Sequence, residues 1–224
     1  MIQLFQKYNW SLEVRQYTKS KVTGIILAGG KGLRLGREKA LEKIGQQRLI
    51  DRVIESLKEV CQDILVVTSQ VQFKKIESAN VDAKIVVDLY PGKSAIGGIY
   101  TGLLNTTTFY NLVVACDMPF LNSSLLRYMI DNAPGFDAVV PQVNDNVEPL
   151  HAVYSVNCIH TIERLLHNNR LAVSEILRLV KTRYIDSSEI TEIDPGHTSF
   201  FNINTPDDLI QAEKLIEVSK EMQY

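Results

Sequence analysis

Cysteine is scarce in this sequence of 224 residues. The three cysteines, Cys61, Cys116 and Cys158, are widely separated and include no Cys-x-x-Cys pair, so their spacing does not indicate a zinc site. An odd number of scattered cysteines fits a reducing, cytoplasmic setting best. Cys116 ends an apolar run with no histidine near it in the sequence, and we interpret it as a core thiol rather than a nucleophile.

An excess of charge of either sign is also absent. Lysine and arginine together number 24, aspartate and glutamate 26, the formal net charge is -2, and no basic residues cluster. Nucleic-acid-binding proteins carry a basic stripe, so we expect no nucleic-acid partner. Residues 1–20 show no secretory pattern and no segment reaches membrane-spanning length. We therefore expect a cytoplasmic protein that does not enter a membrane.

The length is sufficient for one sizeable α/β core, and the composition does not shift along the chain. We expect residues 22–224 to form a single domain. Residues 1–21 are interpreted as an N-terminal extension of unknown role, either a tail or a short helix packed on the body.

Glycine is concentrated in residues 24–41, GIILAGGKGLRLGREKAL, where a short apolar run passes into a loop that ends at a lysine. The apolar run predicts a buried parallel strand. Small residues after it, Ala28, Gly29 and Gly30 among them, allow backbone N–H groups to approach phosphate oxygens. Arg34 and Lys39 add side-chain cations. The pattern indicates a phosphate-binding turn; an ordinary turn is the alternative, but it would have no use for these charges.

Two better-known phosphate loops do not fit this pattern. A P-loop requires Gly-Lys-Ser/Thr, whereas Gly36 is followed by Arg37 and Glu38. A dinucleotide fingerprint requires G-x-G-x-x-G, but here the glycines Gly30, Gly32 and Gly36 are one residue too widely spaced.

The segment L-A-G-G-x-x-x-R-x-G-x-x-K-A-L resembles the signature loop of the molybdenum cofactor guanylyltransferases, within the nucleotidyltransferase superfamily that includes sugar-nucleotide pyrophosphorylases. Leu35 stands where a methionine is usual and Glu38 where an aspartate is usual, and both changes are conservative. The resemblance implies that the backbone of Leu27, Ala28, Gly29 and Gly30 cradles the nucleotide. It also implies that Lys39 and Arg34 neutralise charge on the triphosphate.

After the loop, apolar runs alternate with amphipathic stretches. Strands are expected at residues 64–67, 81–87, 111–115, 138–141 and 182–185, and helices over 49–60, up to about 104, from about 123, and over 159–166, 173–180 and from 206. This alternation predicts an α/β fold with a mostly parallel sheet. The resemblance implies a Rossmann-like three-layer sandwich with a mixed sheet, of the nucleotide-diphospho-sugar transferase type.

Asp88 directly follows the third expected strand, and ligands in open α/β sheets bind at the carboxyl ends of strands. Members of the family show an aspartate followed by P-G-x-x-x-x-G-G here, so the resemblance implies that Asp88 lies near the guanine nucleotide. The alternative is an aspartate that caps its own loop.

Asp117 follows the apolar residues 112–115 and precedes Pro119. A carboxylate at the end of a central strand is a hard oxygen ligand suited to Mg²⁺. A helix N-cap is the alternative, but Asn122 or Ser123 fills that position better. The C-D-x-P-[FY] pattern is also similar to the metal-binding segment of the family.

Three further polar residues stand out in the second half of the chain. His151 lies in an apolar run, and we interpret it as a structural histidine rather than a catalyst. Residues 198–209, TSFFNINTPDDL, contain a helix start at Thr205 and Pro206 that leaves Asn202 and Asn204 without a local role. The family has a matching motif whose asparagines face the active site, so the resemblance makes both candidate site residues.

The resemblance covers residues 22 to about 215. It implies transfer of GMP from MgGTP to the terminal phosphate of molybdopterin, or of Mo-molybdopterin, with release of pyrophosphate. It further suggests molybdenum-insertion proteins and acceptor molybdoenzymes as partners. A phosphate monoester is already an anionic nucleophile near neutral pH, so the step needs no general base.

Three alternatives stay open at this point. Two are related enzymes, a molybdopterin cytidylyltransferase and a phospholactate guanylyltransferase. Cytidylyltransferases that resemble this chain usually read L-A-A-G where it has Leu27, Ala28, Gly29 and Gly30. The third is a nucleotide-binding module without catalysis. The presence of both Lys39 and Asp117 argues against this alternative.

Overall fold

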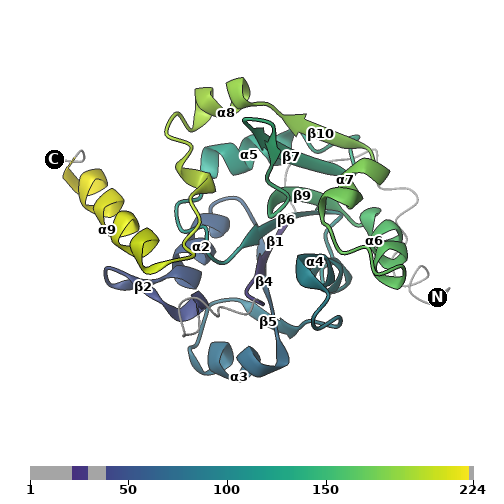
Figure 1. Ribbon diagram of the computed structural model, residues 1–224, viewed down its shortest axis with the longest axis horizontal. Helices are drawn as coiled ribbons and strands as arrows, with labels where there is room; N and C mark the ends of the chain where they lie inside the picture. Colours follow the sequence, from purple (N-terminus) through teal and green to yellow (C-terminus); the bar gives the residue numbers. More distant parts are fainter. Residues whose placement is uncertain (1–21, 30–38, 222–224) are drawn as a thin grey trace.

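A computed structural model describes residues 22–29 and 39–221 of the chain (Figure 1). The expected N-terminal extension, residues 1–21, lies outside the described residues, and so do Gly30 and Arg34. The described part is built on an eight-stranded sheet in the order β10-β7-β9-β6-β1-β4-β5, with β8 paired to β7. The strands are β1 (Val22–Leu27), β4 (Asp63–Thr68), β5 (Lys84–Val87), β6 (Tyr110–Ala115), β7 (Ala138–Val143), β8 (Asn146–Val147), β9 (His151–Ser155) and β10 (Thr182–Ile185).

The sheet is mixed and mostly parallel, as predicted. β1 lies between β4 and β6 and is parallel to both, whereas β9 is antiparallel to β6 and to β7. Leu27, the last residue of β1, pairs with Val67 and with Ala115. The carboxyl ends of these three strands therefore meet at one edge of the sheet, and the segments that follow them start side by side.

Helices cover both faces of the sheet (Figure 1). Alternate residues of each central strand point to opposite sides: Ile26 and Val114 belong to a core cluster that includes α2 and α5, and Ile25 and Val113 to a cluster with α4 and α6. This arrangement confirms the three-layer sandwich. The helices are α2 (Leu49–Lys58), α3 (Gln70–Ser78), α4 (Ser94–Leu104), α5 (Ser123–Asp131), α6 (Cys158–His167), α7 (Ser174–Leu179), α8 (Ser187–Ile193) and α9 (Pro206–Glu221).

A smaller unit lies beside the main sheet, at the left of Figure 1. The strands β2 (Lys43–Ile44) and β3 (Gln47–Arg48) form an antiparallel hairpin, and α9 packs beside it. Ile44, Leu49, Ile203 and Ala212 form a separate buried cluster there. A short 3-10 turn, η2 (Lys39–Leu41), leads into the hairpin from the glycine-rich loop.

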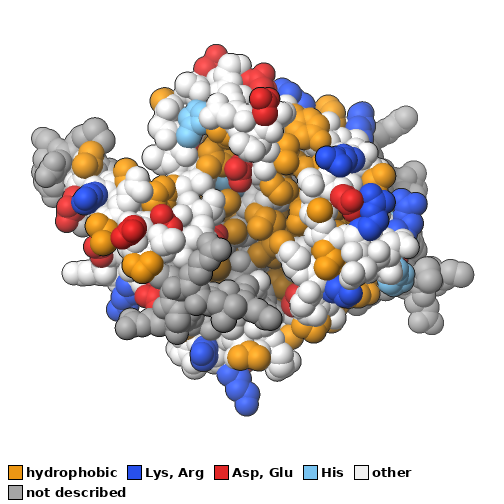
Figure 2. All heavy atoms as spheres, in the orientation of Figure 1, with side chains coloured by type: hydrophobic (Ala, Val, Ile, Leu, Met, Phe, Trp, Pro, Cys, Tyr) orange, Lys and Arg blue, Asp and Glu red, His pale blue; other side chains and the backbone are white. Residues whose placement is uncertain are grey.

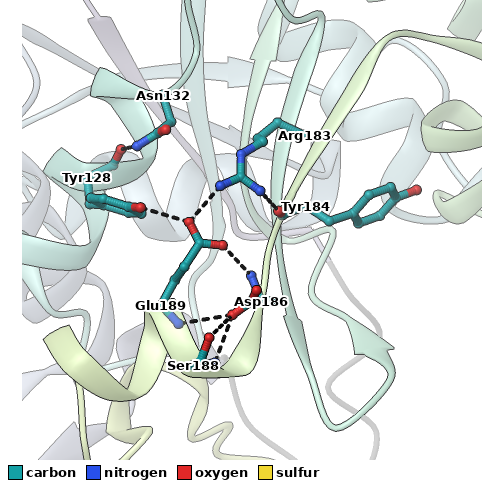
Figure 3. A network of polar contacts seen from close by, with 7 residues as sticks. All are labelled: Tyr128, Asn132, Arg183, Tyr184, Asp186, Ser188 and Glu189. Atoms are coloured by element: carbon teal, nitrogen blue, oxygen red, sulfur yellow. Dashed lines mark hydrogen bonds and ion pairs between the residues drawn. The ribbon is translucent and has the colours of Figure 1, made fainter.

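A polar network holds α8 against α5 and β10 (Figure 3). The Glu189 carboxylate accepts hydrogen bonds from the Tyr128 hydroxyl at 2.7 Å, the Arg183 guanidinium at 2.6 Å and the Asp186 backbone N–H at 3.0 Å. Asp186 in turn caps α8, completing a capping box with Glu189. The network fixes the start of the chain segment that passes through η3 (Thr198–Phe200) to α9.

Some elements differ from the sequence expectations. Residues 142–149, for which no element was expected, contain the end of β7 and the β8 strand paired with it, and β9 was not among the expected strands. The helices α3 and α8 were not anticipated, since each buries one residue, Ile76 and Ile190 respectively, and so gives a weak periodic signal.

Candidate functional site

A pocket of about 210 Å³ opens where β1, β4 and β6 end. Six of the predicted site residues line it: Leu27, Ala28, Gly29, Lys39, Asp88 and Asp117. The first turn of α4 forms another part of the wall through Ser94, Ala95 and Gly98. Figure 2 shows this face hollowed at its centre, with hydrophobic side chains gathered along the hollow. The parallel strands thus bring together residues from four separate sequence segments.

Lys39 is the centre of the polar part of this site. Its ammonium donates to Asp117 Oδ2 at 2.5 Å and to Asn204 Oδ1 at 2.8 Å. The side chains of Lys39 and Asp117 are 18% and 19% exposed, so this ion pair is only partly screened by water. The structure therefore joins the end of the glycine-rich loop, the end of β6 and the segment before α9 through one cation.

The Asp117 backbone is held as firmly as its side chain. Its carbonyl oxygen accepts from Ile203 N–H at 3.0 Å, and the preceding Cys116 N–H donates to Leu27 O at 3.2 Å. One carboxylate oxygen, Oδ1, is buried and has no hydrogen-bond partner in the described part of the chain. A buried carboxylate oxygen without a donor is unfavourable, and a bound cation would satisfy it.

The side-chain oxygen atoms that surround the Lys39 ammonium are suitable ligands for Mg²⁺. Asp117 and Asn204 offer a carboxylate and an amide oxygen, the hard oxygen ligands that Mg²⁺ prefers, and their meeting at Lys39 shows that the spot attracts a cation. The described residues contain no group of three or more His, Cys, Asp or Glu side chains that could hold a metal by themselves. That sparse set fits Mg²⁺, which usually takes few protein ligands and completes its shell with water and substrate phosphates.

Asn202 is not brought to the same point. Its side-chain amide donates to Phe200 O at 3.1 Å, within its own segment, whereas Asn204 reaches Lys39. Of the two asparagines predicted as site residues, the structure unites Asn204 with the cluster.

Asp88 caps its own loop and also borders the pocket. It lines the pocket, and its Oδ1 accepts from Tyr90 N–H at 2.9 Å and from the Thr101 hydroxyl at 3.0 Å. The bond to Thr101 holds the loop against α4, and at the first turn of this helix a Cβ at Gly97 would lie 2.9 Å from Tyr90 O. Asp88 thus caps its loop while facing the pocket.

Gly29 shapes the pocket wall next to β4. A Cβ at this position would lie 3.6 Å from Ser69 N and 3.8 Å from the Thr68 carbonyl carbon, which are ordinary contacts. Its backbone is not in the left-handed region, so an alanine here would place a methyl group beside Thr68 and Ser69 without backbone strain.

His151 and Cys116 take no part in the polar cluster. His151 is fully buried, and its ring packs on Phe200 with the centroids 5.0 Å apart. Burial lowers the pKa of His151 to about 4, although the Asp194 carboxylate and the Ser199 backbone act in the opposite direction. The imidazole is therefore neutral at pH 7, as a structural histidine would be. Cys116 is buried at the pocket wall.

Sequence reasoning did not single out some of the residues that line the pocket. Ala40 and Leu150 carry no chemical signal, since they are apolar residues in apolar surroundings. Ser94 and Gly98 lie in the turn-forming segment after Asp88, and the glycine pair at the start of a helix was the available clue.

Comparison with known proteins finds similar sequences and folds. Residues 24–184 match the family described as the MobA-like NTP transferase domain. A probable molybdenum cofactor guanylyltransferase from Pelotomaculum thermopropionicum is 36% identical over 200 residues, covering 89% of this chain and 96% of that protein. A molybdenum cofactor guanylyltransferase from Desulfosudis oleivorans is 34% identical over 201 residues, covering 89% and 98%.

Solved structures show the same fold. The crystal structure of molybdopterin-guanine dinucleotide biosynthesis protein A from Archaeoglobus fulgidus is similar with a TM-score of 0.77 and 28% identity, covering 88% of this chain and 99% of that one. A 4-diphosphocytidyl-2C-methyl-D-erythritol synthase from Anaerococcus prevotii has a TM-score of 0.68 at 16% identity, covering 88% and 96%, and shares the fold alone.

Proposed function

The chain belongs to the family of MobA-like NTP transferase domains, and on that premise we propose that it is a molybdenum cofactor guanylyltransferase. It transfers GMP from GTP to the terminal phosphate of molybdopterin or Mo-molybdopterin and releases pyrophosphate. The observation that carries the proposal is the Lys39 ammonium held between Asp117 and Asn204 at the mouth of a pocket made by β1, β4 and β6.

Asp117 and Asn204 are the residues that would hold Mg²⁺. When bound, Mg²⁺ withdraws negative charge from the phosphate oxygens of the nucleotide. Asp117 offers its unpartnered Oδ1 for this purpose without giving up its existing contact.

Lys39 carries the charge stabilisation that the chain itself supplies. Its ammonium has three N–H donors, of which two are directed to Asp117 and Asn204. A donor in this position can bind the phosphate oxygens on which charge develops as pyrophosphate leaves. The protein residues thus provide position and charge.

The remaining parts of the pocket orient the nucleotide. The backbone of Leu27, Ala28 and Gly29 borders the cavity on one side and the first turn of α4 on another, where N–H groups at a helix N-terminus favour phosphates. No histidine lines this pocket among the described residues, which agrees with a reaction whose nucleophile is already an anionic phosphate. Gly30 and Arg34 lie outside the described residues. We propose that the backbone of Gly30 completes the nucleotide cradle and that Arg34 neutralises negative charge on the triphosphate.

The acceptor and the cellular setting follow from the names of the relatives. We propose molybdopterin as second substrate, a cytoplasmic location, and molybdenum-insertion proteins and acceptor molybdoenzymes as partners. In the described part of the chain, none of the helices has the length and apolar character needed to cross a bilayer.

A thermal-shift panel of GTP, CTP, ATP and UTP, each with Mg²⁺, tests the donor. A ligand at 100 times its Kd stabilises the folded state by about 2.7 kcal/mol, which raises the Tm of a domain of this size by about 5–10 °C. We expect that shift with GTP at a lower concentration than with the other nucleotides, and a smaller one for Asp117→Asn. Equal shifts with GTP and CTP would contradict the proposed guanine preference.

A further inference from the structure

A buried carboxylate outside the pocket stands out against the surface positions of most acidic residues. Asp194, at the carboxyl end of α8, is 4% exposed and forms no ion pair within the described residues. Its Oδ2 accepts from the Ser199 backbone N–H at 3.0 Å, and its Oδ1 accepts from the Thr198 hydroxyl at 3.3 Å. Burying a carboxylate without an ion-pair partner costs free energy, and the hydrogen bonds from Ser199 and Thr198 offset part of that cost. These bonds also fix the conformation of the turn that follows Asp194.

That turn is tied to the loop that follows β6. Ser199 is fully buried, and its hydroxyl oxygen accepts from Asn122 N–H at 2.9 Å. The Asn122 side chain also donates to Ile193 O at 3.3 Å, just before Asp194. Asn122 is the N-cap of α5, so the turn and the start of this helix hold each other.

A second tie lies next to the polar cluster. Ile203 is fully buried, and its N–H donates to Asp117 O at 3.0 Å. Between the two ties, Phe200 packs on His151 and Phe201 packs on Phe120, with ring centroids 5.0 and 5.8 Å apart. The segment from Ser199 to Ile203 therefore has little freedom to move relative to the end of β6.

The residue after the second tie is Asn204, whose amide oxygen binds Lys39 at 2.8 Å. A shift of the turn would move Ile203, and with it both the Asn204 amide and the Asp117 backbone. Small displacements of a positioned group can cost far more in rate than in stability.

We propose that Asp194 is a positioning residue of the active site: its buried carboxylate fixes the 198–204 segment and thereby sets Asn204 and Asp117 around Lys39. The inference rests on the proposed function for the meaning of that cluster. Asp194 touches neither the pocket nor Lys39, and it acts through Ser199, Ile203 and Asn204.

The test compares two variants that lose a backbone-binding carboxylate. Asp194→Asn keeps size and one acceptor oxygen. The matched control is Asp137→Asn, since Asp137 accepts from Lys181 N–H at 3.1 Å and from the Asn157 amide at 3.0 Å at the opposite edge of the sheet, before β7. We expect Asp194→Asn to lower kcat for GMP transfer at least about 10-fold, with the Kd for GTP within about 2-fold of wild type. Asp137→Asn should change kcat less than about 2-fold, whatever its loss of Tm.

A double-mutant cycle separates positioning from general destabilisation. If Asp194 acts through Asn204, adding Asp194→Asn to Asn204→Ala should lower kcat by less than about 2-fold further. Two effects that multiply in full, or a kcat for Asp194→Asn equal to that of the Asp137 control, would overturn the inference. Ser199→Ala, which removes the bond to Asn122, provides the same cycle if Asp194→Asn does not fold.

A metal titration without nucleotide keeps this test independent of the proposed reaction. Mn²⁺ binding to the folded protein, followed by electron paramagnetic resonance, should weaken several-fold in Asp194→Asn and stay unchanged in Asp137→Asn. Unchanged Mn²⁺ affinity in both variants would contradict the positioning role. A wild type that binds Mn²⁺ but does not use GTP would instead refute the proposed function.

Discussion

Replacing Lys39 by methionine removes the ammonium and keeps most of the stem. In the structure this ammonium holds Asp117 at 2.5 Å and Asn204 at 2.8 Å. Its loss leaves the Asp117 carboxylate, which already has one unpartnered buried oxygen, without its cation. The substitution therefore tests the residue on which the proposed charge stabilisation depends.

The expected fall in kcat and in stability depends on how far the Lys39–Asp117 ion pair is shielded from water. One preorganised donor to developing charge is typically worth about 10²–10³-fold in kcat, or about 2.7–4 kcal/mol. At 18% exposure the Lys39 side chain is shielded enough for that range to apply. The free energy of unfolding should fall less, by about 1–3 kcal/mol, because the pair lies between the exposed and the fully buried case.

Pyrophosphate release from GTP, measured at saturating Mg²⁺ and acceptor, is the assay. Lys58→Met is the matched control, because Lys58 pairs with Asp82 on the surface and lies outside the pocket. We expect at least about 10²-fold lower kcat/KM for Lys39→Met and an unchanged value for Lys58→Met. A folded Lys39→Met enzyme with near-wild-type kcat/KM would refute the reasoning.

Three further substitutions give distinct outcomes. Asp117→Asn should abolish the Mg²⁺-dependent activity with a smaller effect on metal-free GTP binding, which isothermal titration would measure. Gly29→Ala fits without backbone strain, so it should reduce kcat/KM for GTP more than for CTP, by about 1–3 kcal/mol, and a fixed ratio would contradict the guanine pocket. His151, whose pKa is lowered to about 4 in the folded state, binds fewer protons there than in the unfolded chain, so stability falls as the pH drops from about 6.5 to about 4. The loss amounts to about 3 kcal/mol, and urea unfolding of His151→Leu should lack this part of the pH dependence.

The central sheet could be predicted because its strands are buried on both faces and read as apolar runs. All six residues of β6 are buried, and five of the six in β1. The helices α3 and α8 were not predicted because each has a single fully buried residue and so a weak apolar periodicity. Their caps, Ser69 and Asp186, were the available local signals.

The sequence indicates individual candidate residues for the site, but not how they are arranged. Lys39 lies 78 positions from Asp117 and 165 from Asn204, and only the parallel strands and the tie at Ile203 bring the three together. Local pattern also could not separate Asn204 from Asn202, because their side-chain directions depend on the fold of the segment.

The burial of Asp194 could not be predicted from the sequence, for a different reason. An aspartate before a proline and a glycine reads as an exposed loop residue. Its burial arises from the contacts of η3 with the end of α8 and with the start of α5. Buried polar groups of this kind follow from tertiary contacts that no local window contains.

The most direct measurement follows the α-phosphate of the donor. With molybdopterin and Mg²⁺, label from α-³²P-GTP should enter the acceptor as a dinucleotide, with one pyrophosphate released per transfer. Label from α-³²P-CTP should enter at least about 10-fold more slowly. A preference for CTP, or pyrophosphate release without labelled acceptor, would contradict the assignment of this chain as a guanylyltransferase.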